Sequence, residues 1–316
     1  SAGSSAGGGS SGNAGAGGTA AGASGTAGRA NNGGSGGAPA GSCPTSLPTL
    51  AKDGDTSFYA NRSGIPHGVT ISVQYKAGAN KTMRVYTPPG YDANGTTTYP
   101  VLYINHGGGE NDSHWGCTNA NNCGYAGWIL DNLIADGKAV PMIIAMPNTS
   151  DCANFDPPSP PAYSDPCTTQ YVNDFIPYIE QNYKVKADRN SRAIAGLSMG
   201  GLVTLTTGFA HLEIFSHVFV YSSGYIGDAR ARWETNLSAV LGNAAMTNGL
   251  LNAPVYLAAG NTDTALENAR AVHAIFQKNN IKALWQQSSL GHEWANWRRY
   301  LAQTAPLMFK NTSGCN

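Results

Sequence analysis

The chain has 316 residues, and its 19 Lys and Arg balance its 19 Asp and Glu, so that the formal net charge is zero. A balanced charge gives no attraction to nucleic acid or to an anionic membrane surface, and neither is an expected partner. No apolar run reaches the roughly 18 residues of a membrane-spanning helix, so no transmembrane segment is predicted.

The first segment, residues 1–41, consists almost wholly of Gly, Ala, Ser, Asn and Thr, with Arg29 as its one charge. Such a segment has no side chains that can bury a core, so we predict a disordered linker or tail. Residues 42–316 suit one large α/β domain. Because the chain starts at Ser1 rather than Met, we expect that an export signal was removed or that the chain was trimmed.

Extended and helical patterns alternate along residues 42–316. Strands are predicted at 68–75, 82–88, 99–106, 139–147, 192–198, 217–223, 253–260 and 281–288. Apolar residues at helical spacing predict helices at 126–137, 171–183, 199–211 and 264–280. The middle strands are continuously apolar, which is typical of strands covered on both faces. This order predicts a mostly parallel sheet with helices on both faces, with the first two strands paired antiparallel at one edge.

A serine lies between glycines where one of these strands turns into a helix, in the pattern Gly196-x-Ser198-x-Gly200. Glycine inside an ordered element costs about 0.5–1 kcal/mol relative to alanine. At a sharp strand-to-helix turn the residues two before and two after the serine come close together, so both must lack a side chain. The pattern therefore indicates a strained elbow that carries Ser198 as a candidate nucleophile.

A neutral serine needs a base, and the base needs an orienting acid. The histidines after the serine are His211, His217, His273 and His292. His292 follows the last strand in "SSLGHEWANW" and is the predicted base, because its loop emerges at the carboxyl edge of the sheet. Asp263 follows "PVYLAAGNT" in the same topological position and is the predicted acid. Asp228 and Glu267 compete with it and are expected to be a loop carboxylate and a helix-surface charge.

The negative oxygen of a tetrahedral intermediate needs hydrogen-bond donors that are already in place. The backbone N–H of Met199, directly after the serine, is the first predicted donor. The loop "NHGGGEND" supplies the second, for which we choose Gly108, with Gly107 as the alternative. His106 in the same loop is expected to support the loop structurally.

The six cysteines are even in number and lie in sequence surroundings typical of loops: Cys43, Cys117, Cys123, Cys152, Cys167 and Cys315. No pair has the C-x-x-C spacing of a zinc or redox site, so we predict disulfides and an oxidising compartment. Six cysteines allow 15 pairings. Our hypothesis joins Cys117 to Cys123 and Cys152 to Cys167 across short loops, and Cys43 to Cys315 across the ends of the domain.

Six stretches in this order resemble the carbohydrate esterase family 1 of bacterial feruloyl and acetylxylan esterases, which is related to esterase D-like hydrolases. They are "RVYTPPGY", "VLYINHGGGEND", "ILDNLIADGKAVPMIIAMPN", "DFIPYIEQNYKVKADRNSRAIAGLSMGG", "AAGNTD" and "GHEWANW". The resemblance covers residues 64–309 and implies an α/β-hydrolase fold and ester hydrolysis without metal or cofactor. It places the nucleophile, acid and base at Ser198, Asp263 and His292. The triple glycine and the cysteine-bearing loops depart from the family.

We therefore expect a secreted or surface-tethered serine esterase, acting as a monomer, that releases ferulate from feruloylated xylan in plant cell walls. An aromatic acid needs a flat apolar pocket, for which the candidate contacts are Trp115, Trp128, Tyr225 and Trp294. The alternatives are an acetylxylan esterase with a small pocket, an acyltransferase that shields its acyl-enzyme from water, and a non-catalytic carbohydrate-binding module.

Overall fold

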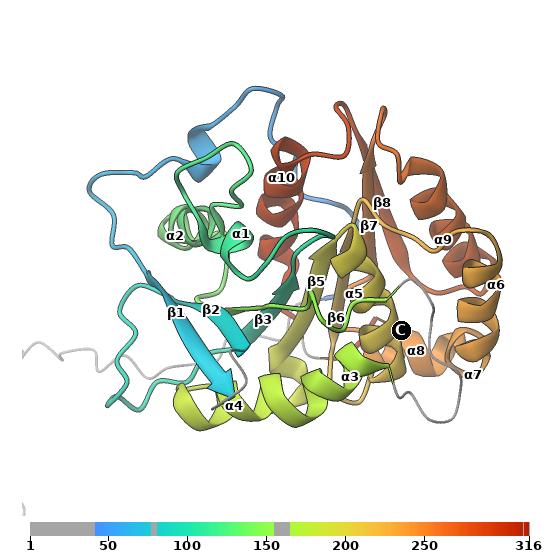
Figure 1. The fold of residues 1–316 in the computed structure, drawn as a ribbon, viewed down its shortest axis with the longest axis horizontal. Coiled ribbons are helices and arrows are strands. Elements are labelled where there is room, and N and C mark those ends of the chain that lie inside the picture. Colours follow the sequence, from blue (N-terminus) through green and yellow to red (C-terminus); the bar gives the residue numbers. More distant parts are fainter. Residues whose placement is uncertain (1–41, 77–80, 155–164, 312, 316) are drawn as a thin grey trace, which may run out of the picture. The chain divides into compact units, whose positions relative to one another are not determined.

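The computed structural model describes residues 42–76, 81–154, 165–311 and 313–315, all within one unit of the chain, Pro39–Asn316. The predicted linker at 1–41 lies outside the described residues. The described part forms one sheet in the order β1-β2-β4-β3-β5-β6-β7-β8 (Figure 1). The strands are β1 Val69–Lys76, β2 Lys81–Thr87, β3 Val101–Asn105, β4 Ile143–Pro147, β5 Arg192–Leu197, β6 His217–Tyr221, β7 Val255–Gly260 and β8 Ala283–Ser288.

The sheet is parallel from β4 to β8, whereas β1 pairs antiparallel with β2 and β2 pairs antiparallel with β4. All eight predicted strands and the antiparallel edge are confirmed. Neighbouring residues of a buried strand point to opposite faces: Val101 and Tyr103 of β3 join one core cluster, and Leu102 joins the other. Both faces are covered, which explains why the middle strands read as unbroken apolar runs.

Helices cover both faces of the sheet. They are α1 Ser113–Gly116, α2 Ala126–Ala135, α3 Pro166–Gln170, α4 Ile176–Asn182, α5 Met199–Ala210, α6 Gly227–Asn236, α7 Ser238–Leu241, α8 Ala244–Leu250, α9 Leu266–Lys278 and α10 Trp294–Thr304. The apolar side chains of α2 and α10 enter one core cluster, and those of α4, α5 and α9 enter the other. Figure 1 shows these helices around the sheet. The predicted helices on both faces are thus confirmed.

Two helical regions differ from the prediction. The helix expected at 171–183 begins earlier, at α3, and passes through a π-helical turn at Tyr171–Phe175 before α4. Pro177 cannot donate an N–H to the turn before it, which is consistent with an irregular ladder there. The short helices α6 to α8 were not predicted, because α6 buries only Trp233 and so shows no apolar period.

All three hypothesised disulfides are present: Cys43–Cys315, Cys117–Cys123 and Cys152–Cys167. The first joins residues 272 positions apart and ties the beginning of the domain to its end.

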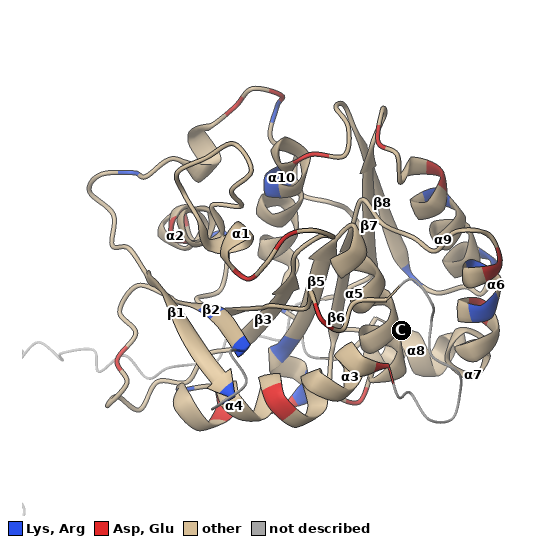
Figure 2. Ribbon diagram, viewed as in Figure 1, with Lys and Arg blue, Asp and Glu red and all other residues tan. Residues whose placement is uncertain are grey.

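Acidic and basic residues are interspersed along the ribbon (Figure 2). Among the described helices, none combines the length and the apolar character needed to cross a bilayer.

One buried histidine makes the stability of this fold depend on pH. His217 opens β6 and is fully buried; its Nε2 accepts the N–H of Phe309 at 3.1 Å, and its Nδ1 lies 2.8 Å from the Ser216 hydroxyl. Since Nε2 is the acceptor, Nδ1 carries the proton and donates to Ser216. Burial, with a smaller contribution from Arg189, lowers the pKa of His217 to about 3.

Stability should therefore fall on acidification. In the unfolded chain His217 binds a proton as the pH falls through about 6.5, whereas the folded protein does not until about pH 3. Between these values this residue should remove about 1.4 kcal/mol of unfolding free energy per pH unit. Urea unfolding of the wild type and His217→Gln from pH 7.5 to 4.5 measures it. The variant should show a shallower slope whatever its stability at pH 7.5, and equal slopes would contradict the assignment.

Candidate active site

Ser198 lies at the tight turn between β5 and α5, with φ 52° and ψ −121°. The two predicted glycines are sterically required there. A Cβ on Gly196 would lie 2.3 Å from the Gly200 carbonyl oxygen, and a Cβ on Gly200 would lie 2.3 Å from the carbonyl oxygen of His106. The N–H of Ser198 donates to Tyr221 of the neighbouring strand β6 at 2.9 Å. The turn therefore presses β5, α5 and the loop after β3 together beneath the serine.

The structure joins the three predicted groups by hydrogen bonds. Nε2 of His292 lies 2.9 Å from Oγ of Ser198, and Nδ1 of His292 lies 2.8 Å from Oδ1 of Asp263. The Asp263 side chain is fully buried, whereas 27% of the His292 side chain is exposed. These distances and their order match a nucleophile, a base and an orienting acid.

Asp263 is held as a carboxylate. Burial raises its pKa, but the hydrogen bonds from His292 and from the N–H of Ala265 at 2.8 Å outweigh that effect, so the pKa lies below its usual value. An ionised carboxylate accepts hydrogen bonds only, so Nδ1 of His292 carries the proton. Nε2 is then the free acceptor that faces the serine hydroxyl.

Asn296 at the start of α10 holds the loop of the base and was not predicted. Its Nδ2 donates to the carbonyl oxygens of Ser289 and Gly291, each at 2.9 Å, on either side of Leu290. Leu290 has a positive φ of 69°, a conformation that is strained for a residue with a branched side chain. The only sequence feature that could have indicated this role is the presence of an Asn four residues after His292.

Glu110 ties the glycine loop to the loop of the base, and it too was not predicted. Its Oε2 accepts the N–H of Gly107 at 2.8 Å, and its Oε1 accepts the indole N–H of Trp294 at 2.8 Å. The amide of Gly107 is therefore occupied. The amides of Gly108 and Met199 have no acceptor in the described part of the chain, and a Cβ on Gly108 would lie 3.3 Å from the Met199 side chain. These two residues face each other beside Ser198.

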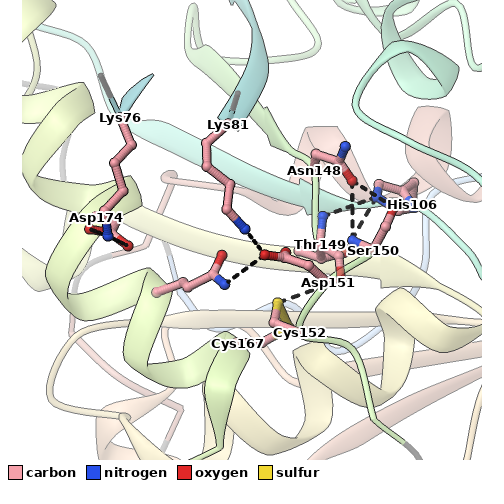
Figure 3. A network of polar contacts seen from close by, with 11 residues as sticks. Lys76, Lys81, His106, Asn148, Thr149, Ser150, Asp151, Cys152, Cys167 and Asp174 are labelled. Carbon is pink, nitrogen blue, oxygen red and sulfur yellow. Dashed lines mark hydrogen bonds and ion pairs between the residues drawn. A yellow bond between two sulfur atoms is a disulfide. The ribbon is translucent and has the colours of Figure 1, made fainter. Parts of the chain in front are cut away.

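His106 joins the glycine loop to the loop after β4, which agrees with the expected structural role; Figure 3 shows His106 beside Thr149. Its Nε2 accepts the N–H of Thr149 at 3.1 Å, so its Nδ1 carries the proton and donates to the carbonyl of Gly107 at 2.8 Å. Burial lowers the pKa of His106, which keeps the ring neutral. The next residues of the loop after β4 are anchored by the Lys81–Asp151 ion pair and the Cys152–Cys167 disulfide (Figure 3).

A pocket of 270 Å³ adjoins Ser198 and His292. One part of its lining is apolar, with Met199, Leu202, Ile226 and Ala265, and the other part is polar, with Ser222, Ser223, Thr264 and Asn268. Ile226 is 65% exposed, the highest fraction among the large apolar residues of the described chain. No periodic pattern could have indicated Ile226, because it lies in the loop between β6 and α6.

None of the four aromatic residues proposed from the sequence lines this pocket. Trp115 is 1% exposed and donates its indole N–H to the carbonyl of Asn105 at 3.0 Å. Trp294 is buried and packs edge-on against Trp115, with ring centroids 5.0 Å apart. Tyr225 is buried with its hydroxyl on Thr206, and Trp128 lines a different pocket.

The parallel sheet, the elbow and the Ser198–His292–Asp263 hydrogen-bond chain together define an α/β-hydrolase. Among the described residues, no group of His, Cys, Asp and Glu side chains is arranged to hold a metal ion. Residues 76–308 match the model of a family described as "Putative esterase". The chain belongs to this esterase family, and the family resemblance seen in the sequence is confirmed.

The curated relatives are larger proteins. An endo-1,4-beta-xylanase/feruloyl esterase of Xylanibacter ruminicola is 31% identical over 281 residues, which cover 85% of this chain and 35% of the relative. Endo-1,4-beta-xylanase Y of Acetivibrio thermocellus is 24% identical over 254 residues, covering 72% of this chain and 22% of the relative. The chain thus spans about a third or less of these relatives' length.

Solved structures share the fold. The feruloyl esterase module from Clostridium thermocellum complexed with sinapinate superposes with a TM-score of 0.66 at 21% identity, covering 86% of this chain and 96% of that one. A ferulic acid esterase from Anaeromyces mucronatus in complex with ferulic acid gives 0.62 at 19% identity, covering 85% and 99%. At these identities the likeness shows the fold alone.

The close approach of the backbone at Gly200 can be tested by substitution. Gly200→Ala places a methyl group against backbone atoms of His106 and Asn105, which cannot move aside, so it should lower the unfolding free energy by about 1–3 kcal/mol. Gly208→Ala is the matched control in the same helix, because its methyl group would meet only side-chain methyls of Val218 and Ile194 at 3.1 to 3.3 Å. Denaturant unfolding compares the two variants. A Gly200→Ala protein as stable as the Gly208→Ala protein would argue against the close approach.

Proposed function

We propose that this chain is a serine esterase that releases ferulate from feruloylated xylan. The observation that carries the proposal is the hydrogen-bond chain from Asp263 through His292 to Ser198 at the mouth of a partly apolar pocket. The names of the relatives, a xylanase/feruloyl esterase and ferulic acid esterases among them, support the substrate class.

In the proposed reaction, Oγ of Ser198 attacks the ester carbonyl carbon while Nε2 of His292 takes the hydroxyl proton. The tetrahedral intermediate collapses, the bond to the sugar oxygen breaks, and His292 returns the proton to that oxygen as the sugar alcohol leaves. Water then attacks the acyl-enzyme by the same route and frees the carboxylic acid and Ser198. Asp263 keeps Nδ1 protonated and stabilises the imidazolium that forms in each half of the reaction.

The oxyanion is proposed to bind the backbone N–H groups of Gly108 and Met199. Both are unpaired in the described part of the chain, and Met199 is the first residue of α5, whose N-terminus favours negative charge. Gly107 is disfavoured because its N–H already donates to Glu110. The choice of Gly108 over Gly107 thus rests on which amide is still free to donate.

An aromatic acyl group suits the pocket better than acetyl. Ile226 lines the pocket and is 65% exposed, and an apolar ring would remove part of that surface from water. The amide of Asn268 and the hydroxyl of Thr264 are available for polar ring substituents. An acetyl group would leave most of the 270 Å³ unfilled. Transfer to an acceptor other than water is disfavoured, because 27% of the His292 side chain is open to solvent.

Export is proposed from the cysteine chemistry. All six cysteines are paired, and such disulfides persist in oxidising compartments outside the cytosol. A polysaccharide of the plant cell wall is itself found outside the cell, which agrees with an exported enzyme.

We also propose that residues 1–41 tether the esterase domain, since a Gly-rich segment of this kind contributes reach rather than a packed core.

Removal of the nucleophile or the base should abolish turnover. Ser198→Ala and His292→Ala should each lower kcat on methyl ferulate by roughly 10⁴-fold or more, because the three groups act as a unit, and Asp263→Asn should lower it less. Rates are measured by release of ferulate, with circular dichroism to confirm folding. A Ser198→Ala enzyme that keeps a tenth of wild-type activity would overturn the assignment.

The acyl pocket predicts a selective effect at Ile226. Ile226→Ala should raise KM for methyl ferulate roughly tenfold, since the lost apolar contact is worth about 1–3 kcal/mol, while p-nitrophenyl acetate turnover changes little. Met246→Ala is the matched control, because Met246 is another exposed apolar residue, 41% exposed, on α8 and outside the pocket. Steady-state kinetics on both esters decide. Equal losses on the two esters would contradict an aromatic acyl pocket, and faster turnover of acetylated xylan than methyl ferulate would favour the acetyl esterase.

A further inference from the structure

A second and larger pocket, of 640 Å³, lies between the β1–β2 hairpin and the segment from α1 to α2. Its lining contains none of the residues that line the pocket at Ser198. Hydroxyl groups come from Thr70 and Ser113, and side-chain amides come from Asn119 and Asn122. Trp128, expected from the sequence to contact substrate, forms part of this wall.

Arg84 on β2 lines this pocket without a polar partner. Its Nε is buried and makes no hydrogen bond, and its side chain forms no ion pair with any described residue. Every other arginine of the described segments has at least one polar interaction. A buried donor left unpaired costs about 1–3 kcal/mol, and more for a charged group. The pocket wall therefore carries a guanidinium group that has no polar partner among the described residues.

The one carboxylate in the lining is already engaged. Oδ1 of Asp131 accepts the N–H of Gly68 at 2.9 Å and the hydroxyl of Tyr86 at 2.6 Å, and Oδ2 lies 3.0 Å from Nδ1 of His67. Asp131 therefore fixes the wall between α2 and the start of β1. It is not the counter-ion of Arg84, because no ion pair joins the two.

The rim of the pocket is held in place before any ligand arrives. The Cys117–Cys123 disulfide closes the loop that carries Asn119 and Asn122. Arg298 of α10 donates to the carbonyl oxygens of Asn121 at 3.1 Å and Cys123 at 2.9 Å. A pre-organised rim reduces the entropy that binding has to overcome.

The pocket also adjoins the residues around the catalytic centre. His114 of α1 lines it, and the His114 ring stacks on Trp294 with centroids 6.3 Å apart and an interplanar angle of 17°. Trp294 is two residues beyond His292 and donates to Glu110 of the glycine loop. The pocket wall is thus linked to the loop of the base through the contact between His114 and Trp294.

We propose that this pocket binds a sugar segment of the polysaccharide substrate, with Arg84 donating to its oxygen atoms. Hydroxyl and amide groups that converge on one cavity match a ligand rich in hydroxyl groups, and the Trp128 ring offers an apolar face to a sugar ring. A small inorganic anion would occupy only a fraction of 640 Å³. The identity of the sugar as xylan rests on the proposed function, whereas the binding of an oligosaccharide does not.

The test is calorimetric titration of the Ser198→Ala protein with xylohexaose, and separately with a xylo-oligosaccharide that bears a glucuronic acid branch. Arg84→Gln, added to Ser198→Ala, should weaken binding of at least one of them roughly tenfold through loss of a charged donor. Tighter binding of the acidic sugar than of the neutral one, lost in Arg84→Gln, would identify a carboxylate as the acceptor. Equal loss for both sugars would identify a hydroxyl.

Two further variants test whether the sugar binds in this pocket and whether the loss of any positive charge has the same effect. Asn122→Trp fills the mouth of the pocket from an exposed position and should abolish binding. Arg270→Gln removes a positive charge from an exposed ion pair on α9 and should leave binding unchanged. Undiminished binding in both Arg84→Gln and Asn122→Trp, or no binding of either sugar to the Ser198→Ala protein, would overturn the proposal. Turnover of methyl ferulate by the wild type tests the proposed function separately, because that ester has no sugar.

Discussion

The strained backbone at Ser198 is the constraint on which the site depends. A residue with a side chain at φ 52° and ψ −121° costs of order 1–3 kcal/mol and persists only where its surroundings determine it. Here the Ser198 N–H is held by Tyr221, its carbonyl accepts the Ser223 hydroxyl at 2.6 Å, and two glycines allow backbone contact. The same turn presents Oγ of Ser198 to Nε2 of His292 and leaves the N–H of Met199 without an acceptor in the described part of the chain.

Side-chain hydrogen bonds, rather than strand pairing, connect the loops around this elbow to one another. Glu110 accepts from Gly107 and Trp294 at once, and hydrogen bonds to a carboxylate are stronger than those between neutral groups. Neutral His106 joins the same glycine loop to Thr149 in the loop after β4. Protonation of His106 would turn its Nε2 from acceptor into donor and break that join. The conformation of the glycine loop thus depends on Glu110 and His106, which lie outside the lining of the pocket at Ser198.

The sequence allowed prediction of those features that follow from local pattern and topology. Strands buried on both faces are apolar throughout, and the elbow requires glycines at fixed offsets from Ser198. The partners Asp263 and His292 followed from the ends of parallel strands meeting at one edge. The substrate wall was not predictable in this way, because an indole such as that of Trp115 has the same sequence signal whether it packs inward or faces a ligand. Ile226 and Arg84 depend on tertiary neighbours that no local pattern encodes.

Under the proposed function, the two pockets suit the unlike halves of a feruloylated sugar. An aromatic acid gains from an apolar wall such as Ile226, whereas a sugar chain loses its hydration and needs donors and acceptors in return. The partly apolar pocket lies at Ser198, and the pocket lined by hydroxyl and amide groups lies between the β1–β2 hairpin and the segment from α1 to α2. Trp294 stacks on His114 of the second pocket and donates to Glu110 of the glycine loop. In the proposed enzyme, binding energy from the distant sugar helps to orient the ester at Ser198 and so raises kcat/KM on the polymer without any change in the catalytic groups.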